Sequence, residues 1–94
     1  MRTILINDTD DWLYSHCFAF KDDQDYHAAV DLLRPYEEIL EKIKHAEIDE
    51  QWDAYREHRD AIWLQIYPKL NDLAALHLQG VTEYYNEFDY KIDV

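Results

Sequence analysis

The chain has little glycine, proline, cysteine or positive charge. One Gly and two Pro in 94 residues exclude collagen-like repeats and Pro/Gly-rich low-complexity tracts. The single cysteine, Cys17, excludes an internal disulfide framework and fits a reducing compartment. No stretch approaches the roughly 18 apolar residues of a membrane span, and the first residues contain too short an apolar run for a signal peptide. We therefore expect a cytoplasmic protein that does not interact with a membrane.

Acidic residues are what the chain has in excess. Twenty-one Asp and Glu stand against nine Lys and Arg, giving a formal net charge of −12. The 48% of hydrophobic and 15% of aromatic residues are typical of a folded domain rather than an acidic tail. We expect one acidic domain over residues 1–94. Its charge disfavours direct binding to nucleic acid, which is itself negative, and favours a positively charged partner.

The first half of the sequence predicts one strand and three helices. Residues 2–6 form a short apolar run typical of a strand. Residues 10–20, after the capping residue Thr9, repeat apolar side chains at helical spacing and are apolar nearly all round, as in a buried helix. Residues 25–33 predict a second helix that stops before Pro35, and a third helix starts there and runs to Ala46.

The second half predicts a long helix and a terminal strand. After a bend near Glu47, an apolar stripe runs from Ile48 to about Gln79, with a kink or break at Tyr67 caused by Pro68. Residues 81–94 fit either a continuation of this helix or a strand; we place a strand from about Phe88, which could pair with residues 2–6. The expected fold is mainly α, a small bundle of four or five helices with a short terminal β pair. Its predicted core contains Trp12, Phe20, Leu33, Ile39, Ile43, Trp52, Tyr55, Ile62 and Ile66.

One face of the long helix carries the candidate binding site. Glu50, Asp53, Glu57 and Asp60, which we call the acidic row, follow one another at i, i+3, i+7 and i+10 opposite the apolar stripe. They span ~15 Å at 1.5 Å per residue, whereas each strand of B-form DNA shows one phosphate per ~3.4 Å. A second set of acids beside it would approach that charge density. The predicted partner-binding residues are Glu37, Glu38, Glu41, the acidic row, and Leu64 as an apolar contact at its end.

The sequence offers little support for catalysis or metal binding. It contains no Glu-x-x-His motif of the kind found in di-iron bundles. Its single glycine, Gly80, excludes a glycine-rich phosphate loop. His16 and His77 lie on apolar faces as expected of core residues, and Arg59 is expected to lay its stem on neighbouring aromatic rings. We predict no enzyme, no metal and no cofactor.

These features favour a small acidic protein that binds and inhibits a basic, nucleic-acid-binding protein through a carboxylate-rich helical face. In composition only, the chain is similar to small phage-encoded DNA-mimic proteins that block restriction or other defence enzymes. One alternative is an immunity protein or antitoxin that neutralises a single nuclease, and another is an acidic oligomeric protein without an inhibitory role. A homodimer is also expected, joined through the helix at residues 10–20 or the C-terminal strand.

Overall fold

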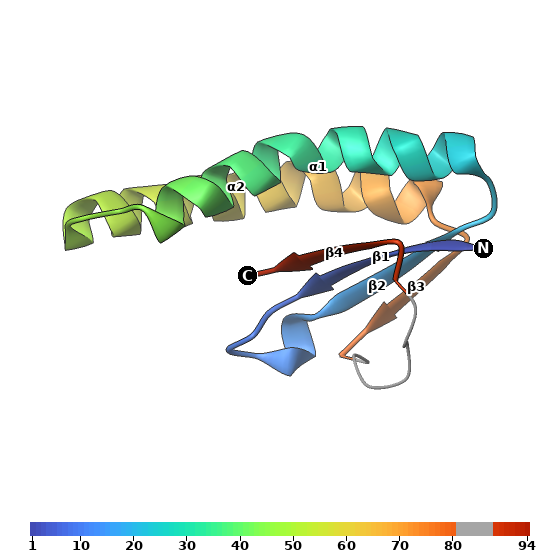
Figure 1. Ribbon diagram of the computed structural model, residues 1–94, viewed down its shortest axis with the longest axis horizontal. Coiled ribbons are helices and arrows are strands. Elements are labelled where there is room, and N and C mark those ends of the chain that lie inside the picture. The colour runs from blue at the N-terminus through green and yellow to red at the C-terminus, as the bar shows by residue number, and fades with distance from the viewer. Residues whose placement is uncertain (81–87) are drawn as a thin grey trace.

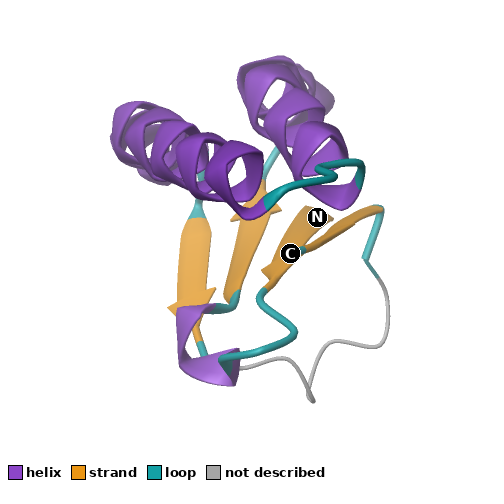
Figure 2. Ribbon diagram, turned by 90° about the vertical axis from the view of Figure 1, so that its left-hand side faces the viewer, coloured by secondary structure: helices purple, strands orange, loops and turns teal. Residues whose placement is uncertain are grey.

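A four-stranded sheet and a hairpin of two long helices form two layers (Figure 1). The computed structural model describes residues 1–80 and 88–94. Both helices cover the same face of the sheet and lie side by side (Figure 2). The elements are β1 (Arg2–Asn7), the short 3₁₀ helix η1 (Trp12–Tyr14), β2 (His16–Phe20), α1 (Asp23–Lys44), α2 (Asp49–Leu73), β3 (Leu76–Gln79) and β4 (Tyr90–Asp93).

The sheet is mixed, with strand order β3-β2-β1-β4. β1 pairs antiparallel with β2 and parallel with β4, and β2 pairs antiparallel with β3. The predicted strand at residues 2–6 and its pairing with a C-terminal strand are both confirmed. Because side chains alternate along a strand, Ile4, Ile6 and Phe18 share the face that packs against the helices.

The predicted helix at residues 10–20 is wrong. Residues 16–20 instead form β2, one of the two inner strands of the sheet, and all five of them are buried. His16, Phe18 and Phe20 face the helices, while Cys17 and Ala19 lie on the opposite face. A strand buried on both faces is apolar along its whole length and resembles a buried helix in sequence. The helix invoked for a homodimer interface does not exist, so the homodimer prediction now depends on β4, an edge strand of the sheet.

The predicted helix boundary at Pro35 is also wrong, and so is the predicted break at Tyr67. Pro35 and Pro68 lie inside α1 and α2, respectively. Each proline removes one backbone hydrogen bond, to the carbonyl four residues earlier, at a cost of about 3 kcal/mol or more. Both prolines are exposed, as are Asp31 and Leu64 at those earlier positions, so water can reach the freed carbonyls. Buried residues on both sides of each proline hold the helices together.

The long helix also ends earlier than predicted, at Leu73. Ala74 is extended, and the Ala75 amide donates to the Ala19 carbonyl at 2.8 Å, which starts the pairing of β3 with β2. The predicted bend near Glu47 is confirmed as the loop between the two helices. The helix-or-strand choice at residues 81–87 lies outside the described residues.

The fold is therefore α+β, not a bundle of four or five helices, and its sheet is not confined to the termini. The core lies between the sheet and the hairpin, and of the predicted core residues Phe20, Leu33, Ile39 and Ile66 are buried. Tyr55, Ile43 and Ile62 are half-buried. Trp12 and Trp52 are 61% and 41% exposed, so their placement in the core was wrong. Trp12 lies in η1 rather than on a packed helix, and Trp52 lies in the first turn of α2, beside the loop that joins the two helices.

The hairpin extends well past the sheet at the end that carries the loop between α1 and α2 (Figure 1). The molecule is correspondingly elongated, with extents of 42 × 25 × 18 Å. At that end Ile48 and Trp52 are exposed, and they border a shallow hollow around residues 46–49. Over the residues that the structure describes, neither helix is long and apolar enough to cross a membrane.

Candidate functional site

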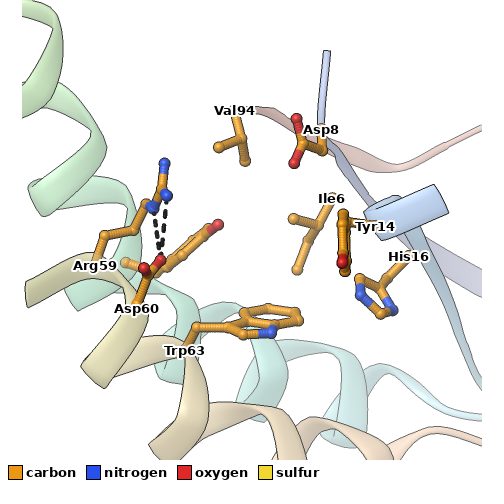
Figure 3. Close-up of a pocket in the computed structure, with 9 residues that line it drawn as sticks. Ile6, Asp8, Tyr14, His16, Arg59, Asp60, Trp63 and Val94 are labelled. Atoms are coloured by element: carbon orange, nitrogen blue, oxygen red, sulfur yellow. Dashed lines mark hydrogen bonds and ion pairs between the residues drawn. The ribbon is translucent and has the colours of Figure 1, made fainter. Parts of the chain in front are cut away.

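A cavity of about 380 Å³ opens between the hairpin and the end of the sheet where β1 finishes and β2 begins. This volume is in the range of small-ligand sites. Figure 3 shows side chains from α2 facing side chains from the strands and η1 across the cavity. The lining residues are Ile6, Asp8, Tyr14, His16, Tyr36, Arg59, Asp60, Trp63 and Val94.

The loop that carries Asp8 and Tyr14 is fixed by its own hydrogen bonds. Asp8 Oδ1 accepts from the backbone amides of Asp10 and Asp11, at 3.0 and 3.1 Å. Asp11 caps η1 by accepting from the Leu13 amide. Carboxylates favour such turns because they replace backbone acceptors. One oxygen of Asp8 is thus used for structure, while Oδ2 has no partner among the described residues.

A buried serine and the only glycine secure the same loop from behind. Ser15 is fully buried; its hydroxyl accepts from the Asp8 amide and donates to Asn7 Oδ1. The Gly80 amide donates to the Ser15 carbonyl at 2.7 Å. Gly80 has φ +73°, a conformation that side chains disfavour, and a Cβ there would lie 3.3 Å from the Trp12 ring. These contacts hold Tyr14 at the cavity while leaving it 62% exposed.

The wall nearest the sheet is an aromatic cluster around a histidine pair. His16 Nδ1 lies 2.8 Å from His77 Nε2, so one ring donates and the other accepts. The His16 ring also contacts Trp63 and Tyr67, with centroids 5.2 and 5.5 Å away. Burial, and secondarily the charge of His77, lowers the pKa of His16 to about 4, and burial lowers the pKa of His77. Both rings are therefore neutral at pH 7.

The wall formed by the hairpin combines one cation with one anion. Arg59 donates from Nε and Nη2 to a single oxygen of Asp60, at 3.2 and 3.1 Å. The Arg59 side chain is only 19% exposed, and it lines the cavity together with Tyr36 and Trp63. Tyr36 packs against Trp63, with ring centroids 5.5 Å apart. Burial raises the pKa of Tyr36 to about 12, an effect that Arg59 opposes, so its phenol stays neutral.

The acidic row lies where the sequence predicted, on the exposed side of α2. Glu57 is nine residues from the buried Ile66, which at 100° per residue is the opposite side of the helix. All four carboxylates are exposed. Glu50, Asp53 and Glu57 form no ion pair or hydrogen bond with any described residue, whereas Asp60 is held by Arg59 and borders the cavity. Leu64 continues this side of the helix and is 75% exposed.

The acids of α1 have different surroundings. Glu37 and Glu41 border a groove against β4 that also contains Lys44 and Lys91. Glu41 pairs with Lys44 and lies 3.6 Å from His45. Partial burial raises the pKa of Glu37, against the opposing charge of Arg34. Glu38 is exposed. Lys44 and Arg34 partly neutralise the acids of α1. Glu37 faces β4 rather than α2, so these acids do not form a second row beside the acidic row.

Sequence reasoning identified Asp60 and Arg59 but missed the cavity between them and the strands. Asp8, Tyr14 and His16 are far from α2 in the sequence, and a helix predicted over residues 10–20 gave no reason to bring them together. One local signal was present: Asp8 is followed by Asp10 and Asp11, an acidic cluster typical of a capped turn.

The described residues contain no group of three or more His, Cys, Asp or Glu side chains placed to hold a metal ion. Cys17 is buried, and burial raises its pKa, so its sulfur is a poor nucleophile. Comparison with protein-family models, with curated proteins and with solved structures found no match.

Proposed function

We propose that the protein binds a basic, nucleic-acid-binding protein through the acidic row and inhibits it by occupying its nucleic-acid site. The observation that carries this proposal is the exposure of Glu50, Asp53 and Glu57, which pair with no cation among the described residues, on a hairpin that extends past the sheet. Neighbouring like charges on a helix cost a few tenths of a kcal/mol each. A positive partner would relieve that repulsion and gain charge-assisted hydrogen bonds where phosphates normally bind.

Two further features support a protein partner. Leu64 is exposed on the same side of α2, beyond the C-terminal end of the acidic row, and offers an apolar contact. Arg56 stacks on Trp52, with its guanidinium carbon 4.5 Å from the ring centroid, and among the described residues it forms no ion pair with Glu50, Asp53 or Glu57. We propose a binding protein rather than an enzyme, because His16 is engaged by His77 and Ser15 is buried in hydrogen bonds. A cytoplasmic setting suits such a partner and a chain with one cysteine.

A second candidate is an immunity protein or antitoxin directed at one nuclease. The observation that favours it is the exposure of Trp12, Leu13 and Tyr14, which lie together in η1. Exposed aromatic residues are typical anchors of tight, specific interfaces. Such an interface would resist salt, whereas one built from exposed carboxylates is screened over a Debye length of ~8–10 Å.

Affinity capture tests the proposal. Immobilised wild-type protein should retain nucleic-acid-binding proteins from a lysate of its source, and double-stranded DNA should elute them. Replacing Glu50, Asp53 and Glu57 by Lys should abolish retention, because all three point away from the core. Asp60 is left in place so that Arg59 keeps its partner.

The matched control replaces three exposed acids outside the row, Asp10, Asp31 and Asp72, by Lys, which gives the same net charge. This control should retain the same proteins. The proposal fails if both triple variants behave alike, or if the retained proteins do not bind nucleic acid. Retention of one nuclease that persists in high salt would select the second candidate.

A further inference from the structure

The cavity beside Asp60 has a composition suited to one class of ligand. Its walls present aromatic rings from Tyr14, Tyr36 and Trp63, and the neutral ring of His16. Aromatic faces attract cations, most strongly when the ring is tryptophan and the cation is a guanidinium that stacks flat on it. The cavity therefore offers binding surfaces for a flat cation that an exposed acidic patch does not.

The charged side chains around the cavity also favour a cationic ligand. Asp8 and Asp60 contribute two carboxylates, and Arg59 contributes one cation, so the lining side chains carry a net charge of −1 within a protein of net charge −12. The Nε and Nη2 groups of Arg59 are already directed at Asp60. Asp8 lies across the cavity from Arg59 (Figure 3), and its Oδ2 has no partner among the described residues.

Asp60 belongs both to the acidic row and to the cavity lining. A basic surface that follows the row along α2 would therefore reach the cavity at its end. We propose that the cavity receives an arginine side chain of the basic partner, with the guanidinium stacked on Trp63 and Tyr14 and hydrogen-bonded to Asp8. This inference rests on the proposed function for the source of the arginine, and it adds the residue type that the site selects.

Short peptides test the inference without the partner. The probes are Ac-Gly-Arg-Gly-NH₂ and its citrulline analogue, which has the same shape but no charge. In ¹⁵N-labelled full-length protein, the indole signal of Trp63, assigned with Trp63→Phe, should shift saturably with the arginine peptide. The citrulline peptide should bind at least tenfold more weakly, which corresponds to ~1.4 kcal/mol. The lysine analogue should also bind more weakly, because an ammonium does not stack.

Asp8→Asn is the decisive variant. Asn can still accept from the amides of Asp10 and Asp11, so the turn is kept and only the charge is lost. It should weaken the arginine peptide about tenfold, whereas Asp10→Asn, an exposed neighbour outside the cavity, should not. Equal binding of arginine and citrulline peptides, or an unchanged Asp8→Asn variant, would overturn the inference. Stronger binding of the glutamate peptide Ac-Gly-Glu-Gly-NH₂ than of the arginine peptide would also overturn the inference. It would show that the cavity binds an anion through Arg59.

The two proposals fail separately. If row reversal abolishes capture but the arginine peptide leaves Trp63 unchanged, the cavity inference falls and the proposed function stands. If the peptide binds as expected but capture yields no nucleic-acid-binding protein, the proposed function falls together with the assigned source of the arginine. The cavity itself would then remain a guanidinium site.

Discussion

Phe18→Ala should lower the free energy of unfolding by about 3–5 kcal/mol. Phe18 is fully buried in the inner strand β2, and its ring stacks on His77 with centroids 4.4 Å apart and planes 6° apart. It also meets Tyr67 edge-on. Truncation would leave a cavity between the sheet and α2 that these rings cannot fill. For a domain of this size, the melting temperature should fall by at least ~12 °C.

Denaturant unfolding of the purified variant measures this loss. Leu64→Ala, at a position that is 75% exposed on α2, is the control and should change stability by less than ~0.5 kcal/mol. If Phe18→Ala does not fold, Phe18→Leu should still fold with a smaller, measurable loss. A loss below ~1 kcal/mol for Phe18→Ala would mean that the face of β2 toward the helices has been assigned incorrectly.

Acidification should destabilise the protein through the His16–His77 pair. In the folded state the pKa of His16 is lowered to about 4, first by burial and then by the charge of His77, and burial lowers that of His77. The unfolded chain, with an ordinary histidine pKa of ~6.5, binds more protons than the folded one between these values. The stability contributed by neutral His16 is therefore complete above pH ~6.5 and is lost as the pH falls toward 4.

Between pH 7 and pH 5 the expected loss from His16 alone is about 2 kcal/mol, because pH 5 lies about 1.5 units below the unfolded pKa and each unit is worth 1.36 kcal/mol. Acidification also reduces the net negative charge of the protein, which lowers its self-repulsion. Because the pKa of Glu37 is raised in the folded state, protonation of Glu37 favours folding as well. Both effects oppose the loss from His16. The informative quantity is therefore the difference between wild type and the double variant His16→Phe/His77→Phe, which keeps two rings but cannot titrate.

Urea unfolding at pH 7, 6 and 5 gives that difference. The double variant should lose less stability than wild type on acidification, and His45→Gln, at a side chain that is 80% exposed, should follow wild type. Parallel pH profiles for wild type and the double variant would show that the pair does not control the acid response. Tautomer-sensitive ¹⁵N spectra of the two rings at pH 7 would identify which nitrogen donates.

The acidic row could be read from the sequence because a helix converts spacing directly into position. Glu50, Asp53 and Glu57 lie on one side of α2 whatever the rest of the chain does, since the helical period alone places them opposite Ile66. The two terminal strands were also predictable, because each alternates or ends at a turn signal. Arg59 was predicted among aromatic residues for the same reason of helical spacing.

The structure of residues 10–20 could not be decided locally. Phe18 and Phe20 are compatible with helical and with extended periodicity, and what selects the strand is pairing with β1 on one side and β3 on the other. Those partners lie up to about 60 residues away. Likewise, Pro35 is a helix-breaking signal that packing of Leu33 and Tyr36 on one continuous face outweighs.

The candidate cavity depended on this tertiary arrangement throughout. Asp8, Tyr14 and Trp63 line the same cavity because residues 16–20 form a strand. The chain turns at η1 before it enters this strand, and the turn brings the loop with Asp8 and Tyr14 close to the hairpin. By itself, the sequence determined the charge, the helical hairpin's exposed carboxylates and the terminal strand pair, since each follows from composition or a local period. Only the tertiary structure decided that residues 16–20 form an inner strand, that both helices continue past their prolines, and that the cavity forms. Each of these features depends on long-range contacts, which a local sequence pattern does not contain.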